Sequence, residues 1–245
     1  MMHIQTTDWR EPALLAPRAP LRLLPRDALV KTSRLDHAVW NFRPVLGAIQ
    51  RLRFNFAREL LGPRRVGRLL EIGYGSGIFL PELDLRCTEL HGVDIHDKQV
   101  EVTEKLVGVG VTPRLQCASA TQLPHPDHHF DRVVAVSSLE FIDDLRGACR
   151  EIRRVLKADG RLVVVTPSRS AVADLGLKIL TGESAKNDYG DRRTGLVETL
   201  LEFFDVDERR TAPLLYTALS LRTPGARRPL SLREAPLRRG KSATA

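Results

Sequence analysis

One short stretch constrains the fold of this chain more than any other, residues 68–80, which read RLLEIGYGSGIFL. An apolar run ends at Ile72, and Gly73, Gly75 and Gly77 follow it before a helix-like pattern begins. Glycine has no Cβ, so a glycine-rich turn lets the backbone approach a ligand closely. A strand, such a turn and a helix start together form a corner whose amide N–H groups face a bound nucleotide. We therefore expect a nucleotide site on an α/β sheet, with a turn that binds nothing as the alternative.

The spacing of the glycines indicates the kind of nucleotide. The dinucleotide fingerprint G-x-G-x-x-G would need a sixth-position glycine, where this chain has Ile78. The sequence instead reads E-x-G-x-G-x-G from Glu71, and these residues resemble motif I of the class I S-adenosylmethionine-dependent methyltransferases. The resemblance implies S-adenosyl-L-methionine as the cofactor, with Glu71 near its methionine amine. The cofactor-binding residues implied in this stretch are Glu71, Gly73, Tyr74, Gly75 and Gly77.

A second acidic position follows at the distance that a ribose-binding residue requires. Residues 89–95 (ELHGVDI) predict a buried strand, and Asp94 lies seventeen residues beyond Gly77. A carboxylate at the carboxyl end of the second strand can accept hydrogen bonds from both ribose hydroxyls. We expect Asp94, with its neighbour Ile95, to hold the cofactor ribose. A surface acid at a strand end is the alternative.

The third predicted strand, residues 113–118, leads into a segment that resembles the adenine-binding segment of the same family. The family commonly has an acidic residue followed by alanine, whereas this chain has Ser119 and Ala120. A serine hydroxyl can still accept a bond from the adenine amine, although more weakly than a carboxylate. We expect Ser119 and Ala120 to contact the adenine.

We expect no metal site and no disulfide. The histidines of the following loop flank a Pro-Asp turn, which predicts solvated side chains, and the cysteines are dispersed without C-x-x-C spacing. Such cysteines are typical of a reducing compartment. With no evident signal peptide and no apolar run of membrane-spanning length, we expect a cytoplasmic protein. The residues concerned are His125, His128, His129, Cys87, Cys117 and Cys149.

Residues 130–167 resemble the second half of the small-molecule, type 11-like branch of the methyltransferase core. They contain a continuous apolar strand at 130–138 with Ser137 near its end, an amphipathic helix and a fifth strand at 161–166. With the first half in the same order, this implies a Rossmann-like, seven-stranded, mostly parallel sheet of order 3-2-1-4-5-7-6 with the seventh strand antiparallel. We expect Ser137 at the cofactor.

The sequence does not identify a general base. The family often has a histidine where this chain has Phe141. Glu140 and Asp143 are nearby carboxylates and therefore weak catalytic candidates, but a strand-end acid and a helix N-cap explain them equally well. A mechanism of proximity and orientation fits the residues at least as well.

Composition divides the chain into an acidic body with basic ends. The net charge of +8 splits into +8 for residues 1–68, −6 for 69–221 and +6 for 222–245. An enzyme acting on nucleic acid more often lines its active-site face with Lys and Arg, so this distribution makes a nucleic-acid partner unlikely.

We predict four segments from the pattern of proline and apolar residues. They are a loosely held, extended basic arm (1–31), a helical cap (32–62), the Rossmann-like core (63–222) and a disordered basic tail (223–245). The cap interleaves arginines with aromatics and could pack on the core, cover the acceptor pocket or bind an anionic surface. Residues 168–195 resemble a variable insertion that shapes that pocket.

The predicted activity is methyl transfer to a small organic acceptor, on oxygen, nitrogen or carbon. RNA or protein methylation guided by the basic ends is one alternative, and a cofactor-binding scaffold without methyl transfer is another. The sequence names neither the acceptor nor the oligomeric state.

Overall fold

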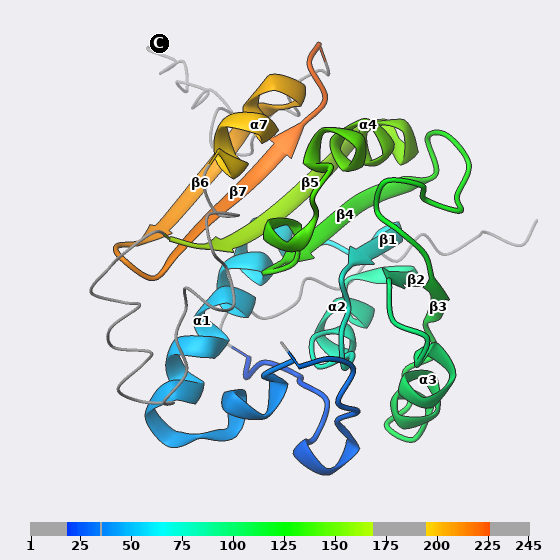
Figure 1. The fold of residues 1–245 in the computed structure, drawn as a ribbon, viewed down its shortest axis with the longest axis vertical. Helices are drawn as coiled ribbons and strands as arrows, with labels where there is room; N and C mark the ends of the chain where they lie inside the picture. Colours follow the sequence, from blue (N-terminus) through cyan, green and yellow to red (C-terminus); the bar gives the residue numbers. More distant parts are fainter. Residues whose placement is uncertain (1–18, 35, 169–194, 226–245) are drawn as a thin grey trace, which may run out of the picture.

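The computed structural model describes residues 19–34, 36–168 and 195–225 (Figure 1). Its centre is a seven-stranded sheet in the order β3-β2-β1-β4-β5-β7-β6. β7 pairs antiparallel with both β5 and β6, and the other neighbours are parallel, which confirms the predicted topology. The strands are β1 (Val66–Ile72), β2 (Cys87–Asp94), β3 (Arg114–Cys117), β4 (Phe130–Val136), β5 (Leu156–Pro167), β6 (Asp205–Ala212) and β7 (Tyr216–Arg222).

Helices cover both faces of the sheet, so the described chain has three layers (Figure 1). One hydrophobic cluster lies between the sheet and α1 (Pro44–Leu61), α2 (Leu80–Asp84) and α3 (Gln99–Val107). A second cluster lies between the sheet and α4 (Leu145–Val155) and α7 (Leu196–Phe203). The central strands are buried on both sides, which explains their continuous apolar runs. Three 3₁₀ helices complete the described elements: η1 (Arg26–Ala28), η2 (Ala38–Phe42) and η3 (Leu139–Phe141).

The register of the central strands brings the predicted site segments together. Ile72 lies beside Val93 of β2 on one side and Ala135 of β4 on the other. Chain order reverses between β1 and β4, and in open α/β sheets ligands bind at the carboxyl ends of the strands beside such a point. The segments that follow β1, β2 and β4 therefore meet at one edge of the sheet.

The first crossover helix is shorter than the sequence predicts. We expect a helix over residues 76–85, whereas α2 begins at Leu80. Gly77 has a φ of 75°, in the left-handed region that a right-handed helix cannot include. Pro81 also suits the first turn of a helix, where its missing N–H costs nothing.

The prediction of a loosely held arm is wrong for residues 19–31. Leu24 is fully buried, and its backbone N–H donates to the carbonyl of Ile78 at 3.0 Å. The backbone N–H of Arg22 donates to Glu82 Oε2 at 2.8 Å, while Oε1 of this buried carboxylate accepts from Arg86 at 2.7 Å. The leucines between the prolines supply apolar surface, and burying it outweighs the proline-rich character of the segment.

The cap is helical, as predicted, and α1 starts with Pro44 in its first turn. α1 contacts β4, β5 and β7, so it lies across the sheet beside the site edge. Among the described residues, no helix is both long and apolar enough to cross a membrane. The expectations for residues 1–18, most of the 168–195 insertion and the tail beyond residue 225 lie outside the described residues.

Candidate active site

A cavity of about 800 Å³ opens at the carboxyl ends of β1, β2 and β4. Its volume falls within the range of about 300–1,000 Å³ that is typical of small-molecule sites. The glycine loop, the ends of these strands, η2 and α1 all contribute to its walls. The cavity therefore lies where the sequence places the nucleotide.

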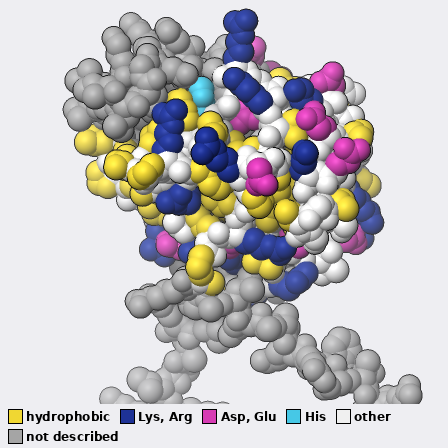
Figure 2. All heavy atoms as spheres, turned by 90° about the horizontal axis from the view of Figure 1, so that it is seen from below, with side chains coloured by type: hydrophobic (Ala, Val, Ile, Leu, Met, Phe, Trp, Pro, Cys, Tyr) yellow, Lys and Arg dark blue, Asp and Glu magenta, His cyan; other side chains and the backbone are white. Residues whose placement is uncertain are grey.

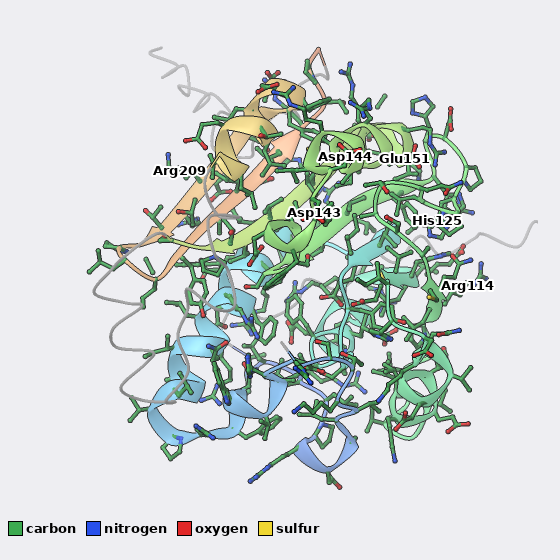
Figure 3. All side chains as sticks on the ribbon, viewed as in Figure 1. Arg114, His125, Asp143, Asp144, Glu151 and Arg209 are labelled. Carbon is green, nitrogen blue, oxygen red and sulfur yellow. The ribbon has the colours of Figure 1, made fainter. Side chains whose placement is uncertain are left out.

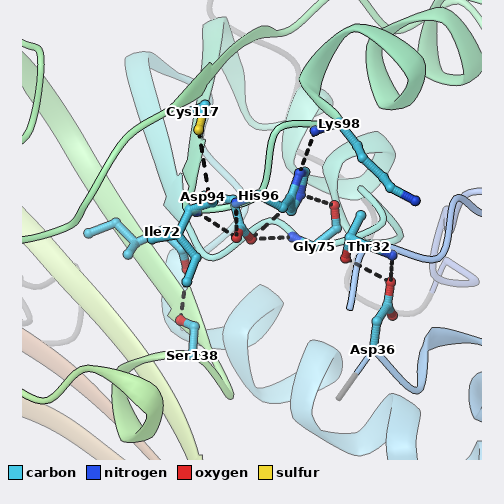
Figure 4. Close-up of polar contacts among 10 residues, drawn as sticks. Thr32, Asp36, Ile72, Gly75, Asp94, His96, Lys98, Cys117 and Ser138 are labelled. Carbon is cyan, nitrogen blue, oxygen red and sulfur yellow. Dashed lines mark hydrogen bonds and ion pairs between the residues drawn. The ribbon is translucent and has the colours of Figure 1, made fainter. Parts of the chain in front are cut away.

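The glycine loop is held tightly against the end of β4. Gly73 has a φ of 75°, and a Cβ at this position would lie 2.4 Å from the Cβ of Ser138. Ser138 in turn donates its hydroxyl hydrogen to the carbonyl of Ile72 at 2.7 Å (Figure 4). A side chain at position 73 would thus push the loop away from the strand that supports it.

Asp94 points toward the glycine loop. Its Oδ2 accepts the backbone N–H of Gly75 at 2.8 Å, and its Oδ1 accepts the N–H of Ile95 at 2.8 Å (Figure 4). A carboxylate offers about four acceptor positions, and Oδ1 also accepts the N–H of His96 at 3.4 Å, so Oδ2 is the oxygen that keeps capacity for a further donor such as a ribose hydroxyl. The same contacts orient the loop before any ligand arrives.

His96, which the sequence analysis did not single out, completes this corner. Its Nδ1 accepts the backbone N–H of Lys98 at 3.1 Å, so its Nε2 carries the hydrogen and donates to the Gly75 carbonyl at 3.0 Å (Figure 4). Its ring also meets the buried ring of Tyr74 edge to face, with centroids 4.9 Å apart. Burial, with the charge of Asp94 as a second cause, raises the pKa of Tyr74, so the phenol stays neutral.

Buried polar atoms without partners face the cavity. Glu71 is 4% exposed, and its Oε2 makes no hydrogen bond to any described residue. Burial raises the pKa of Glu71 to about 8; the charge of Asp94 adds to the rise, and Arg53 opposes it. Ser137, at a φ of 53°, also has a buried hydroxyl without a partner in this part of the chain. A ligand with a cationic amine and further polar groups would satisfy these atoms, so the residues fit the expected cofactor.

The structure brings nearly all of the predicted cofactor residues to one cavity. Ser119 lies at its rim, where its hydroxyl and that of Thr121 are 2.7 Å apart. Gly77 is not among the lining residues; a Cβ there would meet Val102 at 2.9 Å, so this glycine serves the packing of α3. The predicted residues that line the cavity are Glu71, Gly73, Tyr74, Gly75, Asp94, Ile95, Ser119, Ala120 and Ser137.

The two catalytic candidates differ in position. Asp143 is exposed at the cavity wall, whereas Glu140 is buried and is not among the lining residues. The N-cap of α4 is Asp144, whose Oδ1 accepts the N–H of Gly147 at 2.8 Å, so the N-cap explanation for Asp143 is wrong (Figure 3). Phe141 lines the cavity where the family often has a histidine.

Further lining residues come from the cap, whose inward face the sequence did not define. η2 contributes Trp40, whose ring stacks on that of His37 with centroids 3.9 Å apart. α1 contributes Arg53 and Phe54. The interleaved aromatic and basic residues indicate a functional surface. Because Pro44 interrupts the helical periodicity, the sequence does not show which of these residues face the site.

Histidines cluster away from this cavity, around the buried ring of Phe130. Ring centroids are 5.4 Å apart for His91 and His125, and 5.8 Å apart for His91 and His129. No group of three or more ligating side chains suited to a metal occurs among the described residues. The rings of His125 and His129 each meet Phe130 edge to face, so these two side chains contribute to its packing.

The sheet order, the glycine corner and the acid after β2 define the class I methyltransferase fold. Residues 70–164 match the family model described as "Methyltransferase domain".

Curated relatives are similar to this chain over slightly more than half of its length. A ubiquinone/menaquinone biosynthesis C-methyltransferase of Azotobacter vinelandii is 36% identical over 140 residues, 53% of this chain and 54% of the relative. A malonyl-[acyl-carrier protein] O-methyltransferase of Halorhodospira halophila is 31% identical over 158 residues, 59% of this chain and 54% of the relative. The chain thus spans about half the length of the curated relatives it matches.

Solved structures show the same fold. The N-methyltransferase NodS of Bradyrhizobium japonicum, in complex with S-adenosyl-L-homocysteine, superposes with a TM-score of 0.54 at 19% identity. The match covers 79% of this chain and 92% of NodS. At this identity the likeness concerns the fold alone.

Proposed function

We propose that the chain is an S-adenosylmethionine-dependent methyltransferase that acts on a small organic acceptor, at oxygen, nitrogen or carbon. The observation that carries the proposal is the placement of Asp94 and Glu71 in one cavity with the glycine loop. Curated relatives named for C- and O-methyl transfer support it. We also propose that the cap (32–62) and the core (63–222) work as one catalytic unit.

The residues would bind and orient the cofactor. Asp94 and Ile95 would face the ribose, Ser119 and Ala120 the adenine, and Glu71 the methionine amine. The sulfonium of the cofactor supplies an already activated methyl group. Alignment of an acceptor atom in a near-attack position can account for about 7–11 kcal/mol of the barrier.

No residue is needed as a general base in this proposal. Phe141 occupies the position where the family often has a histidine, and Asp143 lines the cavity wall. An acceptor that is already nucleophilic would need orientation alone, and Asp143 would assist an acceptor that must lose a proton.

The acceptor is proposed to be small for two reasons. The cavity is of small-molecule size, and the face seen from below mixes basic, acidic and hydrophobic side chains without a continuous basic stripe among the described residues (Figure 2). Nucleic-acid binding usually needs such a stripe. We propose a cytoplasmic location on the evidence of the free cysteines.

Calorimetry with S-adenosylmethionine and S-adenosylhomocysteine tests the proposal. The wild type is expected to bind both in the micromolar range. Asp94→Asn keeps an oxygen acceptor for the loop but removes the charge, so binding should weaken by about 1.5–3 kcal/mol. Asp97→Ala, an exposed acid three residues further on, is the matched control and should bind as the wild type does.

Three results would contradict the proposal. Wild type that ignores both ligands removes the cofactor assignment. Binding without transfer to any acceptor in a labelled-methyl screen favours the scaffold alternative. Methylation of RNA or protein that disappears when residues 1–18 and 226–245 are deleted favours the polymer alternative; this deletion spares the packed segment around Leu24.

A further inference from the structure

α1 brings one basic side chain into the cavity. Arg53 is the only Lys or Arg among the described residues that line it. The acidic lining residues are Asp36, Glu71, Asp94, Asp143 and Asp144. α1 lies before residue 70, where the family match begins. The family match therefore says nothing about Arg53, and only the contacts of its side chain indicate a role.

Packing fixes Arg53, but its hydrogen-bond donors remain available. The guanidinium carbon lies 4.8 Å from the ring centroid of Phe54, which stacks on Phe79 with centroids 4.5 Å apart. The Nε of Arg53 is buried without a hydrogen-bond partner, and Arg53 makes no hydrogen bond or ion pair with another described residue. A buried donor left unsatisfied is costly, so a ligand group that accepts from it would bind favourably.

Glu71 lines the same cavity as Arg53 and is coupled to it electrostatically. Arg53 is close enough to act against the rise in the pKa of Glu71, yet the two groups do not form an ion pair. The cavity wall thus carries one cationic group and one carboxyl group, which ionises when an ammonium binds beside it. An α-amino acid group, with its ammonium and carboxylate on one carbon, has the matching pair of charges.

We propose that Arg53 binds the α-carboxylate at the methionine end of S-adenosylmethionine, opposite the ammonium held by Glu71. The proposal rests on the proposed function, since it needs the cofactor in this cavity. The planar guanidinium suits a carboxylate because two of its N–H groups can donate to the two oxygens in parallel. The cap would then be part of the cofactor site as well as a wall of the acceptor pocket.

A comparison of two cofactor forms tests this inference by binding alone. S-adenosylmethionine and its decarboxylated form differ by the carboxylate, so calorimetry with both isolates the contact. Arg53→Met should weaken S-adenosylmethionine binding about 10- to 100-fold, as expected for a lost charged hydrogen bond. It should change the affinity for the decarboxylated form less than about twofold. Arg53→Lys keeps the charge without the planar fork and should give an intermediate loss.

Arg58→Met provides the matched control. Arg58 lies on the same helix, donates to the carbonyl of Ala19 and to Asn55 Oδ1, and does not line the cavity. It should leave both affinities unchanged. Thermal unfolding of each variant reports whether α1 stays folded.

The outcomes separate this inference from the proposed function. Equal weakening of both ligands by Arg53→Met would mean that Arg53 shapes the cavity, and an unchanged affinity for S-adenosylmethionine would mean that it serves another ligand; either result overturns the inference. Wild type that binds no adenosyl ligand overturns the proposed function itself. If Arg53→Met does not fold, the Arg53→Lys variant still decides, because a carboxylate contact predicts loss for one ligand alone.

Discussion

At the scale of single residues, Glu71 links the affinity for the cofactor to pH. Its folded pKa is about 8, so at pH 6.5 the free protein holds this carboxyl protonated. An ammonium group beside it favours the ionised form. Binding of S-adenosylhomocysteine should therefore release close to one proton, and the affinity should rise about tenfold per pH unit between pH 6 and 7.5. Calorimetry in buffers of different ionisation enthalpy counts the proton.

The matched controls for this prediction come from the protein and from the ligand. Glu71→Gln cannot ionise, so its affinity should not vary in this window and no proton should be released. 5′-Methylthioadenosine lacks the amino acid group and should bind wild type without proton release. A flat affinity for S-adenosylhomocysteine in wild type would show that Glu71 does not meet the ammonium.

The residues that could be predicted are those that the backbone of the fold dictates. Gly73 must pass close to Ser138, and Asp94 must end the strand next to the loop, so both leave a local signature in the sequence. Arg53 and His96 leave none, because their roles depend on contacts across the cavity or on a local ring orientation. The substitution of Ser119 for an acid is visible in the sequence, but its consequence for adenine binding is not.

At the scale of secondary-structure elements, Asp143 and Asp144 should contribute differently to stability, because Asp144 alone is the N-cap of α4. Asp144→Ala removes the side chain that accepts the N–H of Gly147 and should lower the free energy of unfolding by about 1 kcal/mol. Asp143→Ala, one residue earlier, leaves the N-cap hydrogen bond of α4 intact and should change the free energy of unfolding by less than about 0.5 kcal/mol. Urea unfolding of both variants at pH 7 measures the difference. Equal losses would mean that the cap contributes nothing beyond the charge.

Elements with strong periodicity were predicted to within a few residues, and the exceptions have local causes. β2 and β3 lie within two residues of their predicted bounds, and β5 begins five residues before its predicted start because Leu156 already pairs with Phe130. α2 loses its first turn to the left-handed Gly77. Residues 19–31 depart from the prediction because burial of their leucines outweighs their proline content, and this burial depends on the surface that the leucines meet.

At the scale of the whole molecule, the buried Glu71 and the half-buried His125 change the free energy of unfolding with pH in opposite directions. Burial and the neighbouring His91 and His129 lower the pKa of His125 to about 4, so the folded state keeps it neutral. The unfolded chain takes up the proton near pH 6.5, and the stability that His125 contributes is lost as the pH falls from 6.5 toward 4. Glu71 acts in the other direction, since its raised pKa removes stability as the pH rises from 4.5 to 8.

These opposite effects predict that the free energy of unfolding is largest between about pH 4.5 and 6.5. One variant tests the decrease on the acid side of this maximum, and another tests the decrease on the alkaline side. His125→Phe keeps the edge-to-face contact with Phe130 but cannot take up a proton. Between pH 6.5 and 4.5 the free energy of unfolding of this variant should therefore fall by about 1–2 kcal/mol less than that of wild type. This figure is reduced for the partial exposure of the ring. Glu71→Gln should remove the fall between pH 6.5 and 8, and it should steepen the loss of stability between pH 6.5 and 4.5, where Glu71 and His125 oppose each other in wild type. Urea unfolding at four pH values across this range measures both, and each variant is the control for the other. If His125→Phe loses stability in acid as steeply as wild type, the acid flank comes from carboxylates that pair in the fold, such as Asp131 and Glu151, whose pKa values are lowered by their basic partners.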